Sequence, residues 1–173
     1  MNYFHSKSNL LTSEECEQFI SRIDKESLPL SPWYKCVYAN LYDYDFLEKK
    51  VREAVIEYIN LHPFLNNIPM EWHIDASMNL QWYEPGEAFS AEHCEHGHHP
   101  HDQHRILGWM IYLNNVYDDG ETYWPQQNYK VKPEAGKFLI WPAAWTHSHY
   151  GIPSPTENKY VITGWCSYVS ERR

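Results

Sequence analysis

Hydrophobic residues recur at helical intervals in the segment LLTSEECEQFISRID, near the start of the chain. These positions fall on one side of a helix: Leu11, Cys16, Phe19, Ile20 and Ile23. Thr12 and Glu15 have the spacing of a capping box, in which each side chain accepts a hydrogen bond from the other residue's backbone N–H. The pattern therefore predicts a helix from about residue 13 to about residue 25.

A second amphipathic helix is predicted in the segment DFLEKKVREAVIEYINLHP. One side of this helix is apolar: Leu47, Val51, Val55, Tyr58 and Ile59. Pro63 ends the helix, because proline cannot donate the next backbone hydrogen bond. The segment SLPLSPWYKC lies between the two predicted helices, and we interpret it as a proline-rich connection.

After residue 65 the pattern changes to short runs of β-branched and aromatic residues, separated by turn formers such as Pro85-Gly86 and Asp119-Gly120. The runs are IDASMNLQWYEPGEAF, RILGWMIYLNNV, ETYWPQ, YKVKPEAGKFLIWP, THSHYGI and KYVITGWCSYV. Strands at this spacing favour a sandwich or barrel. We therefore expect a mainly β fold with flanking N-terminal helices (α+β). It should form one domain over residues 1–173, with a helical part over about 1–65 and a β core over about 66–173.

Charge and cysteine content exclude several kinds of protein. The net charge of −9 repels phosphate backbones, so we expect no nucleic-acid partner. No segment approaches the roughly 20 apolar residues of a membrane span, and MNYFHSKSNLLTSEE lacks the apolar core of a signal peptide. The cysteines form no CxxC pair, and we interpret them as reduced thiols of a cytoplasmic protein: Cys16, Cys36, Cys94 and Cys166.

Residues 91–104, AEHCEHGHHPHDQH, hold six of the eleven histidines. If this segment is a strand, His93 and Glu95 point to the same face. An imidazole and a carboxylate are two parts of the 2-His-1-carboxylate arrangement that binds Fe(II). The alternative is that both residues are exposed on a loop.

A third ligand could come from WPAAWTHSHYG, where His147 and His149 would also share a face of a strand. These two histidines could instead be bonded to the backbone. Lys159 lies near the start of an apolar run, ENKYVITGW. It is either a solvated strand end or a cation inside a cavity, where it would suit a dicarboxylate ligand.

Seven motifs occur in order along about half of the chain, from residue 80 to residue 165. They are YxPG, H-x-acid, R-x-L followed by YLN, DDGET, V-x-P-x-x-G, WP, and a histidine followed by Lys-Tyr. Together they resemble the catalytic domain of the prolyl 4-hydroxylase-type Fe(II)/2-oxoglutarate dioxygenases. The resemblance implies a double-stranded β-helix, or jelly roll. It also implies hydroxylation of a C–H bond in a peptidyl, for example prolyl, or small-molecule substrate, with succinate and CO2 as co-products.

The same resemblance implies Fe(II) as the metal, 2-oxoglutarate and O2 as co-substrates, and ascorbate as a further candidate cofactor. It assigns the catalytic metal ligands as His93, Glu95 and His149. The family has a basic residue ten positions after the distal histidine, and Lys159 stands ten positions after His149. His147 is therefore expected beside the metal rather than on it. The residues expected to bind 2-oxoglutarate are Lys159, Tyr83, Tyr112 and Thr163.

Two departures from the family pattern bear on the site. The acidic ligand is Glu95 where aspartate is more common, and the gap from Tyr83 to His93 is one residue longer, which predicts a bulge near residues 91–92. Arg105 stands at the family's arginine before the YLN strand, and it could equally form a structural ion pair. The retained carboxylate argues against a halogenase.

The remaining histidines of the segment are expected on a loop beside the substrate groove: His96, His98, His99, His101 and His104. Weak, adventitious metal binding is their other interpretation. Two other functions stay open. One is a non-catalytic module that binds Zn(II) or Ni(II) through this loop on a cupin-like scaffold. The other is a cupin-type enzyme that does not use 2-oxoglutarate.

Overall fold

The computed structural model describes residues 3–26, 28–31, 34–97, 99–100 and 102–169. The two predicted helices are present in it as α1 (Ser13–Glu26) and α2 (Asp45–Leu61). The capping box at the start of α1 is also confirmed. The backbone N–H of Thr12 donates to Glu15 at 2.8 Å, and the N–H of Glu15 donates to the Thr12 hydroxyl at 3.2 Å. None of the described helices is long and apolar enough to cross a membrane.

Seven antiparallel strands form the larger sheet, in the order β1-β8-β5-β10-β4-β3-β2. Their bounds are β1 His5–Lys7, β2 Leu28–Ser31, β3 Tyr34–Asn40, β4 Trp72–Tyr83, β5 Arg105–Tyr112, β8 Phe138–Pro142 and β10 Lys159–Tyr168. A three-stranded sheet has the order β7-β6-β9, with β6 Thr122–Trp124, β7 Tyr129–Val131 and β9 Tyr150–Gly151. Short 3-10 helices lie between strands: Leu41–Asp43, Pro63–Asn66, Asp102–His104, Pro125–Gln127 and Trp145–His147.

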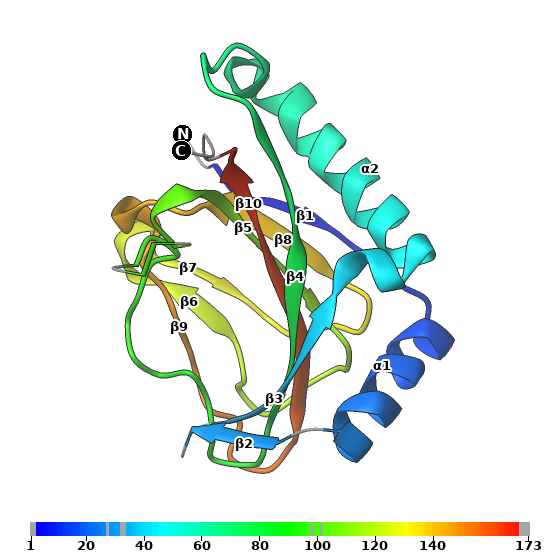
Figure 1. The fold of residues 1–173 in the computed structure, drawn as a ribbon. Helices are drawn as coiled ribbons and strands as arrows, with labels where there is room; N and C mark the ends of the chain where they lie inside the picture. The colour runs from blue at the N-terminus through cyan, green and yellow to red at the C-terminus, as the bar shows by residue number, and fades with distance from the viewer. Residues whose placement is uncertain (1–2, 27, 32–33, 98, 101, 170–173) are drawn as a thin grey trace.

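The two sheets and the helices form layers (Figure 1). The helices α1 and α2 cover one face of the larger sheet, and their apolar sides join a core with β4, β5, β8 and β10. A second buried cluster lies between the two sheets and contains Tyr112, Trp124 and Trp141. This arrangement confirms the predicted mainly β jelly roll with flanking helices. The two sheets bury apolar side chains against each other, and the helices cover the other face of the larger sheet.

The first 65 residues contain more β structure than their sequence pattern indicates. The expected proline-rich connection instead contributes β2 and the start of β3, and β1 precedes α1. Proline is compatible with β2 because β2 is the edge strand of its sheet, where a missing N–H is tolerated. Along β3, Val37 is buried while Tyr38 is exposed, as expected where successive side chains of a strand point to opposite faces of the sheet.

Candidate active site

A cavity of about 780 Å³ is lined by strands of both sheets and by the segment between β4 and β5. Residues from β4, β5, β8 and β10 form most of its wall, and Thr122 of β6 and Gly151 of β9 close the other side. His93, Glu95 and His149 line this cavity together with Lys159. The candidate metal ligands and the buried lysine therefore face the same space.

His93, Glu95 and His149 converge on one point of the cavity wall, where their ligand atoms lie within 4.8 Å of one another. The segment carrying His93 and Glu95 is a loop rather than the expected strand. It is fixed to the chain around His149 by an isolated antiparallel bridge, in which His93 N–H donates to His149 O at 3.0 Å and His149 N–H donates to His93 O at 2.8 Å. Residues 91–92, where a bulge was predicted, lie in this loop and outside the described strands.

Both imidazoles are oriented by backbone carbonyl groups. The Nδ1 of His93 lies 2.9 Å from the carbonyl oxygen of Ala91, and the Nδ1 of His149 lies 3.1 Å from that of His147. Each Nδ1–H therefore donates to a carbonyl, which leaves the lone pair of Nε2 facing the cavity. Burial and the neighbouring His149 lower the pKa of His93, so this ring stays neutral, as a metal ligand must.

The carboxylate of Glu95 is ionised although it is buried. Burial alone would raise the pKa of Glu95, but the polar groups around the carboxylate lower it, among them the indole N–H of Trp165. Its Oε1 lies 3.3 Å from Nε2 of His149. With Nδ1 protonated, these two atoms are both acceptors, and a cation between them resolves the conflict. The donor set fits a divalent metal of the 2-His-1-carboxylate type.

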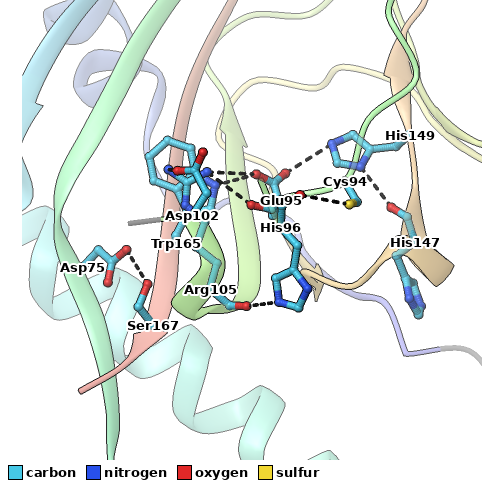
Figure 2. Close-up of polar contacts among 10 residues, drawn as sticks. All are labelled: Asp75, Cys94, Glu95, His96, Asp102, Arg105, His147, His149, Trp165 and Ser167. Atoms are coloured by element: carbon cyan, nitrogen blue, oxygen red, sulfur yellow. Dashed lines mark hydrogen bonds and ion pairs between the residues drawn. The ribbon is translucent and has the colours of Figure 1, made fainter. Parts of the chain in front are cut away.

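His147 does not join these three residues. It ends the 3-10 helix Trp145–His147, and its buried ring packs against Phe4 and Tyr3, with centroids 5.2 and 6.3 Å away. Figure 2 shows the ring pointing away from Glu95. The expectation that His147 and His149 share a face is therefore wrong, because the short helix turns the chain between them. His147 contributes only its carbonyl oxygen, to the Nδ1–H of His149.

Lys159 opens β10 and points into the cavity rather than into solvent, with 5% of its surface exposed. Its ammonium donates to the carbonyl oxygen of Gly120 at 3.1 Å and lies 5.1 Å from the centre of the Tyr83 ring. Burial lowers the pKa of Lys159 to about 8, and the charge of Glu121 partly opposes this shift. The buried ammonium of Lys159 can therefore pair with an anionic ligand in the cavity.

Thr163 lies on the same face of β10 as Lys159 and also lines the cavity. Its hydroxyl oxygen is buried and has no hydrogen-bond partner in the described part of the chain. A buried polar group without a partner is costly, so this hydroxyl is a second indication that the cavity accommodates a polar ligand.

The two predicted tyrosines differ in their positions. Tyr83 is buried, lines the cavity and donates its hydroxyl to Oε1 of Gln81 at 3.1 Å. Tyr112 is fully buried behind the wall, with its hydroxyl 2.7 Å from Oγ1 of Thr122 and 3.2 Å from the carbonyl oxygen of Val131. Thr122 lines the cavity and Tyr112 does not, so the Tyr112 hydroxyl is connected to the cavity wall through its hydrogen bond with Thr122.

Several cavity residues have no counterpart among the sequence-based predictions. Ser77, Asn79 and Gln81 form a polar row along β4, and Tyr38 lies opposite Asn79 on β3. The signal was present in MNLQWY, where every second residue of an otherwise apolar strand is polar. Trp165 of β10 is another such residue, and its contact with Glu95 becomes visible only when the strands are assembled.

The histidine-rich segment does not form a metal cluster among the residues described here. His99 lines the cavity, the ring of His96 is bonded to the carbonyl oxygen of Arg105, and His104 ends the 3-10 helix Asp102–His104. His98 and His101 lie outside the described residues. Within the described chain, the only cluster of His, Cys, Asp and Glu side chains able to hold a metal is the one containing His93, Glu95 and His149.

Comparison with known proteins agrees with this site. Residues 70–167 match the family model of the 2OG-Fe(II) oxygenase superfamily, which is more than half of the chain. The chain belongs to this superfamily, whose members use Fe(II) and 2-oxoglutarate. The predicted family, its metal and its co-substrate are thereby confirmed.

The relatives and structural neighbours include prolyl hydroxylases. A protein of Acanthamoeba polyphaga mimivirus, whose name assigns it to the prolyl 4-hydroxylases, is 36% identical over 69 residues, covering 35% of this chain and 28% of that protein. The match thus spans less than a third of that relative. The viral collagen prolyl hydroxylase of Paramecium bursaria Chlorella virus-1, solved with 2-oxoglutarate, has a TM-score of 0.75 at 18% identity over 97% of both chains.

A prolyl hydroxylase of Trichoplax adhaerens is a further structural neighbour, solved with a peptide of the hypoxia inducible factor degradation domain. It has a TM-score of 0.70 and 19% identity over 96% of this chain and 84% of that one. At such identities the two solved structures establish the shared fold.

Proposed function

We propose that this chain is an Fe(II)- and 2-oxoglutarate-dependent dioxygenase that hydroxylates a C–H bond of a peptidyl substrate. A prolyl residue is the first candidate for the hydroxylated residue, and succinate and CO2 are the co-products. Residues 1–173 would form a single domain of this kind. The observation that carries the proposal is that a 2-His-1-carboxylate set and a buried lysine line the same cavity.

In this proposal His93, Glu95 and His149 would hold the iron, and 2-oxoglutarate and O2 would be its co-substrates. Bound iron and 2-oxoglutarate together supply the oxidising power for C–H hydroxylation. The chain itself would bind and orient the iron and 2-oxoglutarate and would shield them from water. The carbonyl oxygens of Ala91 and His147 would accept hydrogen bonds from the Nδ1–H groups and so hold the Nε2 atoms of both imidazoles toward the metal.

Lys159 and Thr163 would hold the far carboxylate of 2-oxoglutarate. A carboxylate there would accept a charge-assisted hydrogen bond from the buried ammonium and a second bond from the unpartnered hydroxyl. Tyr83 would support the same ligand from β4, since its ring lies beside the ammonium. Tyr112 would not contact 2-oxoglutarate itself. It would orient the hydroxyl of Thr122, which lines the cavity.

A peptidyl substrate is supported by the polar row on β4. Ser77 and Asn79 offer hydrogen bonds to an extended backbone, and Tyr38 beside them is 70% exposed and free to cover a bound chain. The collagen and hypoxia inducible factor substrates named for the structural neighbours are peptides as well. The net charge of −9 makes a nucleic-acid substrate unfavourable.

An anaerobic titration tests the proposed function directly. Fe(II) and 2-oxoglutarate together should produce a visible charge-transfer band that neither produces alone. Admission of O2 and ascorbate with proline-containing peptides should then yield succinate. The absence of both the band and succinate would contradict the proposal. A zinc- or nickel-binding module without activity would instead bind those ions and show no dependence on 2-oxoglutarate.

We expect the affinity for 2-oxoglutarate to depend on pH through Lys159, whose pKa is lowered to about 8. Only the protonated amine can pair with a carboxylate, so above this pKa binding must draw a proton onto Lys159. The dissociation constant should be level below pH 8 and rise about tenfold per pH unit above it. Titrations of the metal-loaded protein across this range measure the effect. Lys159→Arg is the control, because arginine stays charged and should remove the rise.

We also propose a cytoplasmic location for this protein, on the basis of its thiols. All four cysteines are free, and three of them are buried. Burial raises the pKa of Cys16 to about 11 and that of Cys36 to about 12, so neither thiol is reactive near neutral pH. Reduced, unreactive cysteines are typical of proteins in a reducing compartment.

A further inference from the structure

The two oxygens of Glu95 have different partners. Oε1 faces His149, with 3.3 Å between Oε1 and Nε2. Oε2 accepts a hydrogen bond from the indole N–H of Trp165 at 2.5 Å. Figure 2 shows the carboxylate held between these two side chains, with Trp165 on the side away from His149. One oxygen is therefore directed to the ligand set and the other is turned away from it.

A glycine provides the space in which the Glu95 side chain lies. Gly108 of β5 is the direct pairing partner of Trp165 on β10. A Cβ atom at position 108 would lie 2.9 Å from Cγ of Glu95 and 3.0 Å from Cε2 of Trp141. Such distances are too short for a methyl group without rearrangement. The pair of Gly108 and Trp165 thus leaves a slot for the glutamate and places a hydrogen-bond donor at its end.

Arg105 fixes the indole ring in this position. Its guanidinium lies 3.8 Å from the centre of the Trp165 ring, in a cation–π contact. The same guanidinium pairs with Asp102 at 3.0 Å and donates to the backbone oxygen of Glu95 at 3.4 Å. It also lies 4.0 Å from Oε2 of Glu95, so it supports the same oxygen at a longer distance than the indole N–H. Trp165 is therefore held by a guanidinium that is itself anchored to Asp102 and Glu95, so its N–H has a defined direction.

We propose that Trp165 is a positioning residue that makes Glu95 a one-oxygen metal ligand, by engaging Oε2 so that Oε1 alone faces the metal. This inference rests on the proposed function, because it needs the metal site. A glutamate has one methylene more than an aspartate, so it can turn both oxygens toward a cation. Chelation by both oxygens would occupy a coordination position that the co-substrates require. The hydrogen bond from the indole N–H of Trp165 holds Oε2 away from the metal and so prevents chelation by both oxygens.

The test is a double-mutant cycle on metal affinity, read without turnover. Trp165→Phe removes the N–H and keeps a ring beneath Arg105. We expect it to weaken Co(II) binding about 10- to 100-fold, the usual effect of losing a partner of a metal ligand. The absorption spectrum of bound Co(II) should also change, because the coordination number of the ion changes. Trp82→Phe is the matched control, since its buried indole N–H has no partner in the described chain and it lies outside the cavity wall.

The second arm of the cycle uses Glu95→Asp, whose shorter carboxylate reaches less far toward the indole. In that background Trp165→Phe should change Co(II) affinity less than about 3-fold. An equal loss in both backgrounds would mean that Trp165 acts through general packing, and it would overturn the inference.

A third variant separates the hydrogen bond from the shape of the ring. Benzothienylalanine at position 165 replaces the indole N–H by sulfur and keeps the bicyclic shape. It should reproduce the loss seen in Trp165→Phe at an unchanged melting temperature. Wild-type affinity in this variant would overturn the inference even if Trp165→Phe fails to fold. If the wild-type chain binds neither Co(II) nor Fe(II), the proposed function fails, and this inference fails with it. Equal metal affinity in all Trp165 variants would overturn this inference and leave the proposed function intact.

Discussion

Replacing His149 by alanine is expected to abolish Fe(II) binding and to reduce succinate formation by at least about 10³-fold. The Nε2 of His149 is one of only three ligand atoms that meet in the cavity, and no other histidine in the described chain lies close enough to replace it. Metal content after equilibrium dialysis measures the first effect. Succinate released from 2-oxoglutarate measures the second.

His147→Ala is the matched control, because it removes an equally buried histidine two positions away. Its ring packs against Phe4 and Tyr3, so we expect a loss of stability of about 1–3 kcal/mol, measurable by urea denaturation, with metal affinity close to that of the wild type. The reverse pattern, in which His147→Ala loses the metal and His149→Ala keeps it, would refute the ligand assignment.

Lys159→Met should weaken 2-oxoglutarate binding by about 10²-fold or more and leave Fe(II) affinity unchanged. The ammonium is the buried cation of the cavity wall, and methionine offers the same length without charge or donor. The Michaelis constant for 2-oxoglutarate and the charge-transfer band both report this loss. An unaltered Michaelis constant would contradict the assignment of Lys159 to the carboxylate of 2-oxoglutarate, whereas the cupin-type alternative predicts turnover that does not depend on 2-oxoglutarate in either protein.

The same variant should be more stable than the wild type in the absence of 2-oxoglutarate. The pKa of Lys159 in the folded chain, about 8, lies below that of an unfolded lysine, so the fold disfavours the charged amine. This destabilisation is complete below pH 8 and diminishes as the pH rises toward the unfolded pKa. The melting temperature of Lys159→Met should therefore exceed that of the wild type at pH 7, and the difference should shrink near pH 10. Saturating 2-oxoglutarate should stabilise only the wild type.

The ordered motifs of the sequence were sufficient to predict the fold and the family, and they singled out several of the residues that line the cavity, among them His93, His149 and Lys159. The interval of ten residues between His149 and Lys159 was informative because it matches the pattern of the family. The sequence also left open whether Lys159 was solvated. Its burial depends on Gly120 and Tyr83, which come from other strands and turns, and a local pattern cannot report such contacts.

Local structure around the site was harder to predict. A strand was expected at His93 and Glu95 because alternate residues of a strand share a face, yet a loop with a single bridge brings them together. The contribution of β3 was missed because proline dominates the segment before it, although its pairing with β4 outweighs that signal. The role of Trp165 depends on its register with Gly108, which only the assembled sheet defines.

The backbone bridge between His93 and His149 joins the two ligand-bearing segments through amide groups alone. Alanine in place of either histidine would therefore remove a metal ligand and leave the two segments joined through their backbone amide groups.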